Sequence, residues 1–192
     1  SAPGLGGTIR ITSDGGDITA DGEIVADRGT VIISNLGGGP GPNGAPPPAP
    51  SVSLDGSFAS IRAETIQIAS AGDLNLGLNT SVSLKGVTVS LSALRDINGG
   101  FLNLSGDGPI PVTNSSGNVD IRAGSSIRLA GLEVGRRNNG RTTGLNITID
   151  AGSSFSITNF LSLFTDASDL TSGGNISLTS GGPMSLGNSA NL

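Results

Sequence analysis

A short phrase of alternating apolar and polar residues, bounded by glycine, recurs along this chain. Three copies are clear, and they read GNVDIRAG, GLNITIDAG and GNISLTSG. Their equivalent apolar residues are Val119, Ile147 and Ile176, so the interval between copies is nearly constant. A regular interval of this size, with strand-type alternation inside each unit, is typical of a stacked β-solenoid.

The rest of the chain continues the same pattern in looser form. Two further copies occur at residues 7–13 and 64–70, and no stretch keeps a helical 3.6-residue apolar period. Between the apolar runs stand turn residues such as Asp-Gly and Asn-Gly-Gly. The sequence therefore predicts an all-β fold, a right-handed parallel β-helix of about seven coils, in preference to a β-sandwich.

The apolar residues that alternate in each run are the predicted core. The chain has five Phe, no Trp and no Tyr, so we expect aliphatic ladders to fill a narrow interior. The predicted inward-facing residues that define these ladders are Ile9, Ile11, Ile66, Ile68, Val119, Ile121, Ile147, Ile149, Ile176 and Leu178.

Three segments interrupt the coil pattern and are predicted to be loop insertions. They are residues 37–50, rich in Pro and Gly, residues 105–116, and residues 135–143. Outside them, residues 1–192 are predicted to form a single β-solenoid segment. Reading Leu192 directly into Ser1 continues the coil pattern, which predicts that the segment belongs to a longer array.

Charge and composition argue against several functions. The chain has 10 basic and 15 acidic residues, a net charge of −5, and it lacks the basic face of a nucleic-acid-binding protein. No long apolar run predicts membrane insertion. Since His and Cys are absent, the common nucleophile–base pairs lack their usual members. We therefore expect no enzyme and no cofactor.

Two groups of charged residues are candidate sites. Asp14, Asp17, Asp21 and Glu23 could supply oxygen ligands to calcium, although Asp residues in turns more often bond their own backbone. A candidate ligand loop holds Arg136, Arg137 and Arg141, whose guanidinium groups could bind anionic glycans or lipid headgroups. The alternative for these arginines is simple solvation.

The coils resemble a known family of surface proteins. The segments GGNISLTSGGPMSLGNSANL and GNVDIRAGSSIRLAG are similar to the shaft repeats of filamentous-haemagglutinin-type exoproteins of two-partner secretion systems, closest in style to long cyanobacterial surface proteins. The resemblance implies a right-handed parallel β-helix, export to the cell surface, and roles in adhesion, aggregation and matrix formation. The family's secretion domain carries Asn-Pro-Asn-Gly motifs, of which this chain has only Pro42-Asn43-Gly44.

These observations predict a structural shaft or filament segment of a secreted cell-surface or extracellular-matrix protein. Its expected partner is the chain itself, end to end or laterally, with glycans as a further candidate and nucleic acid and membrane insertion excluded. The alternative is an adhesin that binds glycans or a host partner through its protruding loops. A polysaccharide-cleaving enzyme built on Asp17 and its neighbours is the third hypothesis.

Overall fold

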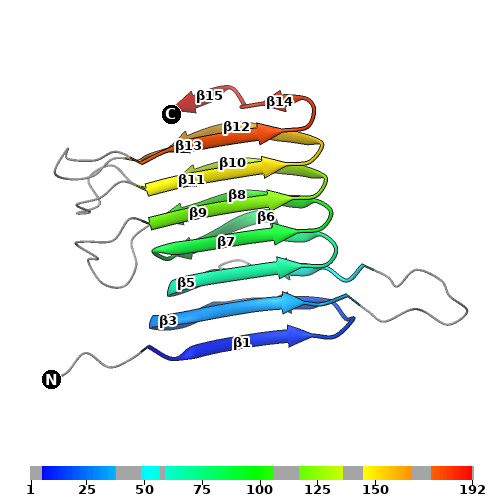
Figure 1. Cartoon of the computed structure of the whole chain (residues 1–192), viewed down its shortest axis with the longest axis vertical. Coiled ribbons are helices and arrows are strands. Elements are labelled where there is room, and N and C mark those ends of the chain that lie inside the picture. Colours follow the sequence, from blue (N-terminus) through cyan, green and yellow to red (C-terminus); the bar gives the residue numbers. More distant parts are fainter. Residues whose placement is uncertain are drawn as a thin grey trace, which may run out of the picture.

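The chain forms a stack of coils that rises from β1 at one end to β13, β14 and β15 at the other (Figure 1). The computed structural model describes residues 6–37, 49–56, 59–105, 117–135, 145–165 and 174–191. In this part of the chain there is no helix, and fifteen strands join in one sheet in which every pairing is parallel. The predicted parallel β-helix is therefore confirmed.

The strands range from two to thirteen residues, and several of the long ones bend across a corner of the coil. In chain order they are β1 (Thr8–Ser13), β2 (Ile18–Ala20), β3 (Glu23–Asn35), β4 (Val52–Leu54), β5 (Ser60–Ser70), β6 (Leu74–Lys85), β7 (Thr88–Ala93), β8 (Ile97–Ser105), β9 (Gly117–Ala123), β10 (Ser126–Val134), β11 (Leu145–Ala151), β12 (Ser154–Leu163), β13 (Ile176–Ser180), β14 (Met184–Ser185) and β15 (Ser189–Asn191).

Three ladders make the sides of each coil. Ladder A joins β1, β3, β5, β7, β9, β11 and β13. Ladder B joins β2, β4, β6, β8, β10, β12 and β14. Six long strands each take part in two ladders, with one half in ladder A or B and the other half in ladder C. These strands are β3, β5, β6, β8, β10 and β12, and ladder C ends in β15. Ladders A and B each join seven strands, one in each coil, so the predicted number of about seven coils is confirmed.

The basic coil is shorter than the period visible in the sequence. In ladder A, Ile9 pairs with Val31 and Ile66 with Val89, and these pairings define the length of one coil. The longer intervals on either side of Ile147 contain residues 136–144 and 166–173, which connect ladder C to ladder A. Each of these two intervals therefore consists of the short coil, as defined by the Ile9–Val31 and Ile66–Val89 pairings, plus a longer connection.

The predicted insertions fall at two corners of the coil. Residues 105–116 and 135–143 connect ladder C to ladder A, whereas residues 37–50 connect ladder A to ladder B. Most of these three segments lies outside the described residues. The connection at 166–173, which also lies outside the described part, was not among the predicted insertions.

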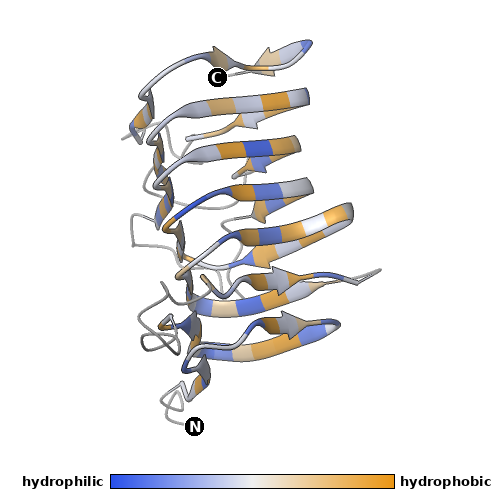
Figure 2. Cartoon of the chain, turned by 90° about the vertical axis from the view of Figure 1, so that its right-hand side faces the viewer, coloured by the Kyte–Doolittle hydropathy of each residue, from blue (hydrophilic) through white to orange (hydrophobic). Residues whose placement is uncertain are grey.

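The core is a continuous column of apolar side chains, aliphatic except for Phe155. Most sides of a coil contribute an alternating apolar pair, and Figure 2 shows this alternation along the coils. On one side of the β7–β8 coil, Gly99 stands in register with Leu76 and Leu129 in place of a second apolar side chain. The predicted inward residues of the inner coils are at most 2% exposed, and these are Ile66, Ile68, Val119, Ile121, Ile147 and Ile149. Ile9 and Ile11 in the first coil and Ile176 and Leu178 in the last are only partly buried, because each is packed from one side.

Candidate functional site: the outer columns and the corner groove

Because the coils stack in register, equivalent residues form columns along the outside. One column stands at the start of ladder A and is called here the Thr/Asn column. Its members are Thr8, Thr30, Thr65, Thr88, Asn118, Asn146 and Asn175. Asn146 Nδ2 donates to Asn118 Oδ1 at 3.2 Å, and Asn175 Nδ2 donates to Asn146 Oδ1 at 3.3 Å. This amide ladder therefore continues into the last coil.

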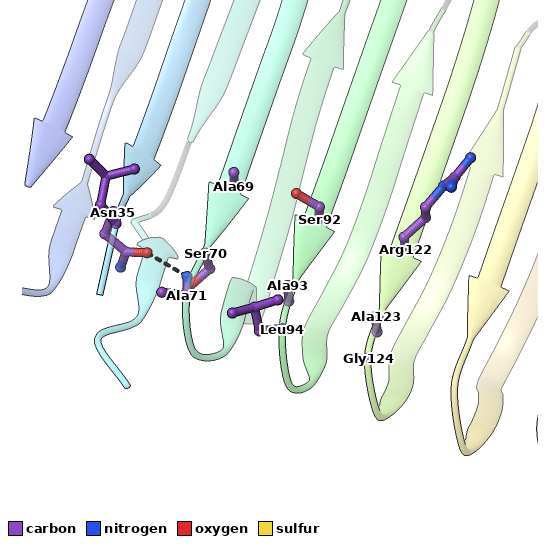
Figure 3. A pocket seen from close by; sticks show the side chains of 11 residues that line it. Asn35, Ala69, Ser70, Ala71, Ser92, Ala93, Leu94, Arg122, Ala123 and Gly124 are labelled. Atoms are coloured by element: carbon purple, nitrogen blue, oxygen red, sulfur yellow. Dashed lines mark hydrogen bonds between the residues drawn. The ribbon is translucent and has the colours of Figure 1, made fainter. Parts of the chain in front are cut away.

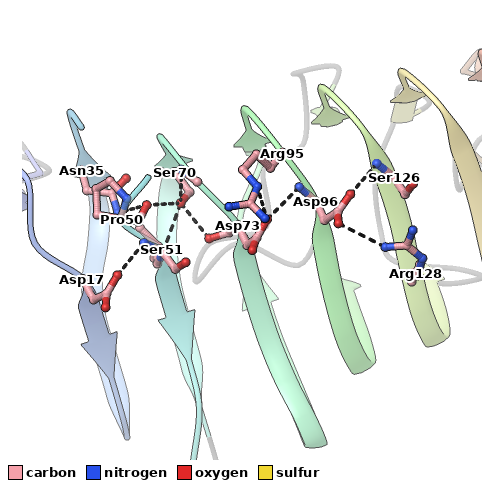
Figure 4. Close-up of polar contacts among 12 residues, drawn as sticks. Asp17, Asn35, Pro50, Ser51, Ser70, Asp73, Arg95, Asp96, Ser126 and Arg128 are labelled. Atoms are coloured by element: carbon pink, nitrogen blue, oxygen red, sulfur yellow. Dashed lines mark hydrogen bonds and ion pairs between the residues drawn. The ribbon is translucent and has the colours of Figure 1, made fainter. Parts of the chain in front are cut away.

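A second column links neighbouring coils through carboxylates. It stands just before the first apolar residue of the ladder B strands, and its members include Asp17, Ser51, Asp73, Asp96 and Ser126 (Figure 4). Asp17 Oδ1 accepts the Ser51 N–H at 2.7 Å, Asp73 Oδ1 accepts the Asp96 N–H at 3.1 Å, and Asp96 Oδ1 accepts the Ser126 N–H at 2.8 Å. Each carboxylate thus holds the backbone of the following coil.

The electrostatics of this column are strongest at Asp96. Its other oxygen, Oδ2, lies 3.2 Å from Arg128 Nη1. Burial acts to raise the pKa of Asp96, but hydrogen bonds from the Ser126 N–H, the Ser125 side chain and Arg128 outweigh it and hold that pKa below its ordinary value. The folded state therefore favours the ionised carboxylate.

Substituting Asp96→Asn is expected to remove a pH-dependent part of the stability. A carboxyl whose pKa is lowered by folding stabilises the fold above its ordinary pKa, and the contribution is lost as the pH falls through the folded value. The variant should unfold at a lower temperature than the wild type at pH 7, and the difference should shrink below about pH 4. Thermal unfolding by circular dichroism from pH 2 to 7 measures this. If the unfolding temperatures of the wild type and the variant differ by the same amount at every pH, the proposed role of the Asp96 carboxylate is wrong.

Buried polar residues fix the corner between ladders A and B. Asn35 and Ser70 are 3% and 4% exposed and lie one above the other in successive coils. Asn35 Nδ2 donates to the Pro50 carbonyl at 2.9 Å, and Asn35 Oδ1 accepts the Ala71 N–H at 2.7 Å. Ser70 Oγ donates to the Asp73 carbonyl at 2.7 Å. These bonds anchor the chain on both sides of residues 38–48.

An open groove of about 480 Å³ runs along this same corner (Figure 3). Small residues of successive coils form much of it, and Leu36 and Leu94 are 72% and 73% exposed beside it. Among the described residues that line it, Arg122 is the only charged one, and its Nε lies 2.8 Å from Asp120 Oδ1.

A second hollow, of about 420 Å³, lies between ladders B and C. It is lined by Thr19, Asp21, Asp55, Gly56 and Thr80. The two aspartates occupy equivalent positions in successive coils, since the Asp55 N–H donates to the Ala20 carbonyl at 3.1 Å. This is where the structure places one of the four predicted calcium candidates.

The other three calcium candidates lie elsewhere on the first coil. Asp17 binds the Ser51 N–H, and Asp14 and Glu23 are exposed. Among the described residues, no group of three or more His, Cys, Asp or Glu side chains could hold a metal ion. In this part of the chain the four carboxylates are therefore not brought together.

The candidate ligand loop falls outside the described residues. Arg136, Arg137 and Arg141 all lie within residues 136–144, so their role as a binding loop stays a prediction.

An aromatic pair on ladder C depends on a glycine. The rings of Phe101 and Phe160 have centroids 5.0 Å apart, although the two residues stand two coils apart with Gly131 between them. A Cβ on Gly131 would lie 2.7 Å from Phe101 Cδ2 and 3.3 Å from Phe160 Cε1. The glycine leaves the space in which the rings meet.

Substituting Gly131→Ala is expected to separate these rings at modest cost. The added methyl group meets side-chain atoms that can rotate, so the loss of stability should be about 1–2 kcal/mol. Chemical denaturation measures it, and Phe101→Leu combined with Gly131→Ala is the informative double variant. If the cost of Gly131→Ala stays the same when Phe101 is Leu, the proposed clash is wrong.

Sequence reasoning did not identify Asp73, Asp96, Asn35 or Ser70 as structural polar residues. A signal for the carboxylate column was present, because Asp17, Asp73 and Asp96 each precede the first apolar residue of a ladder B strand. It becomes visible only when the chain is aligned with the short coil of the structure instead of the longer period of the repeated phrase.

Comparison with known protein families, with curated proteins and with solved structures finds no match to this chain. Within the described residues, no helix is long and apolar enough to cross a membrane.

Proposed function

We propose that the chain is a structural shaft segment of a secreted cell-surface or extracellular-matrix protein, which acts by coil stacking and self-association. The observation that carries the proposal is the continuous apolar core. Every inner coil places buried apolar side chains on its three sides, most of them as aliphatic pairs, and the same ladders continue from one end of the described stack to the other. In a repeat of this kind, each coil contacts only the neighbouring coils, so further coils of the same type can be added at either end.

The cohesion between coils supports a mechanical role. Two neighbouring coils are joined by the hydrogen bonds of three ladders and by the packing of their aliphatic pairs. The Asp73 and Asp96 carboxylates add side-chain bonds that cross from one coil to the next. Pulling two coils apart would break all of these together and expose apolar surface to water.

The chemistry of the outer faces supports close packing between shafts. The outer face of ladder A carries mostly short polar side chains. In the Thr/Asn column, the amides of Asn118, Asn146 and Asn175 bond to one another along the axis. The columns beside it mix Ser and Thr with a few charged residues, among them Arg10, Asp120, Arg122 and Asp150. Short side chains lose little conformational entropy when a neighbour covers them. Sparse charge keeps repulsion between parallel shafts low.

The location of the protein is tested with an antibody raised against the full chain. In cells that make the protein naturally, the antibody should label intact cells or their matrix, and external protease should remove the label. Labelling only after the cells are broken open would overturn the secreted location.

The alternative of an adhesin is tested by shortening the loops. Residues 38–48, 106–116 and 136–144 are each replaced by a short Gly-Ser link, and the variants are compared with the full chain on a glycan array and by circular dichroism. A shaft should keep its β signal and its unfolding temperature, and neither form should bind glycans. Glycan binding by the full chain that the loop-shortened variants lose would favour the adhesin instead.

A further inference from the structure

Both ends of the described stack leave strand edges without a partner. Among the described strands, β1 pairs only with β3, and β13 pairs only with β11. The partly buried apolar residues that flank the core all belong to the two end coils: Ile9, Ile11, Ala20, Ile24, Ala26, Ile176, Leu178 and Leu186. Unpaired edges beside a half-covered core are a template for another chain.

We propose that the C-terminal coil of one chain binds the N-terminal coil of a second copy, head to tail, with Ile176 placed over Ile9. This inference rests on the proposed shaft function and names its partner and its contact. It extends ladders A and B by one more parallel pair each, and Leu178 then covers Ile11. The half-exposed apolar residues of both coils become part of one continuous core.

The free hydrogen-bonding groups match in this register. The Thr30 N–H donates to the Gly7 carbonyl at 3.0 Å, so alternation along the strand directs the free groups of Thr8 and Arg10 away from β3. At the other end, the Ile147 N–H donates to the Asn175 carbonyl at 2.8 Å, which directs the N–H and C=O of Ile176 away from β11. Ile176 can therefore donate to the Thr8 carbonyl and accept from the Arg10 N–H.

The second ladder matches in the same way. The Ile18 N–H donates to the Ser51 carbonyl at 3.0 Å, and the Phe155 N–H donates to the Pro183 carbonyl at 3.1 Å. Asp17 just before β2, Thr19 on β2 and Met184 on β14 therefore direct their free groups outward along the axis. If Met184 lies over Ile18, the free backbone N–H and C=O groups of both strands find hydrogen-bond partners. The outer Thr/Asn column is also continued, because Asn175 would meet Thr8.

Charge and topology favour head-to-tail contact over contact between like ends. Residues 6–28 hold five acidic and two basic residues, a net charge of −3, whereas residues 174–191 hold no charged residue. Two N-terminal coils would therefore repel each other, and an N-terminal coil meets no charge on a C-terminal one.

A two-fold axis would also reverse the direction of the chain, so that ladder B of one copy would meet ladder C of the other. A head-to-tail contact does not close, and it produces a filament.

The test uses proline at the free edge. Arg10→Pro removes the N–H that would donate to Ile176, and Leu178→Pro removes a free N–H at the other end, while the bonds within the chain stay intact. Each variant should remain short in sedimentation velocity and electron microscopy, whereas the wild type and the controls Arg10→Ala and Ser177→Ala should form filaments, because Ser177 is exposed on β13 and its side chain takes no part in the contact. If Arg10→Pro fails to fold by circular dichroism, Thr12→Pro replaces it.

Mixing the two blocked variants gives the sharpest result. Arg10→Pro keeps its C-terminal end open and Leu178→Pro keeps its N-terminal end open, so an equimolar mixture should give dimers and nothing longer. Filaments of either blocked variant, or a mixture that stays monomeric, would overturn the head-to-tail contact. A folded wild type that stays monomeric would overturn this inference and the self-association, but it would leave standing the secreted shaft, whose location the antibody measures separately. Loss of the β signal in the wild type would overturn both.

Discussion

Replacing Ile147 by Asp will unfold the C-terminal coils of the protein. Ile147 is 1% exposed and lies between Val119 below and Ile176 above in ladder A. A carboxylate there has no cationic partner within the aliphatic column, so the expected loss of stability is about 5 kcal/mol or more. The measurement is thermal or chemical unfolding followed by circular dichroism, together with hydrogen exchange of β11 and β13.

The control for this variant is Ser156→Asp in the same coil. Ser156 lies on the outer face of ladder B, one coil above Arg128, so its carboxylate stays in water near a cation. Its unfolding should differ from that of the wild type by less than about 0.5 kcal/mol. An Ile147→Asp variant as stable as Ser156→Asp would show that Ile147 does not face the interior.

The second large effect is expected from Gly100→Ala at the corner between ladders B and C. A Cβ on Gly100 would lie 2.4 Å from the Gly77 carbonyl oxygen and 2.4 Å from the Thr80 carbonyl oxygen. Both are backbone atoms, so the neighbouring coil must move and its ladder bonds weaken. The expected cost is about 3 kcal/mol, larger than for Gly131→Ala, where side chains can give way.

Gly7→Ala is the matched control for Gly100→Ala. A Cβ on Gly7 would find no atom within 4 Å, and the residue is exposed. Its substitution should change the free energy of unfolding by less than about 0.5 kcal/mol. Equal costs for the two variants would mean that the close approach at Gly100 is not what limits this corner.

The sequence was sufficient to predict the fold because alternation is repeated so many times. Ile66 and Ile68, or Val119 and Ile121, are separated by one outward residue in every case, and that period directs them to one face. The coil length could not be predicted from the same signal. The clearest copies of the phrase, at Val119, Ile147 and Ile176, are those separated by added connections, so their spacing exceeds the coil itself.

The contacts on the outside of the stack depend on how the residues of one coil align with those of the next. One copy of the repeated sequence phrase does not show this alignment. Asp96 accepts a hydrogen bond from the Ser126 N–H in the following coil. Asn35 donates to the Pro50 carbonyl and accepts from the Ala71 N–H, and both partners are far from it in the sequence. The calcium hypothesis at Asp14, Asp17, Asp21 and Glu23 was based on spacing along one stretch. In the folded coil, Asp17 faces the next coil while Asp21 lies at a different corner.

Electron cryomicroscopy of the 192-residue chain across a range of concentrations tests the central claim most directly. A shaft that extends by coil stacking should give unbranched filaments one coil wide, with a layer spacing of about 4.8 Å along the axis and a chain repeat of about 34 Å. Compact round particles, or fibres whose strands do not stack along the filament axis, would contradict the account.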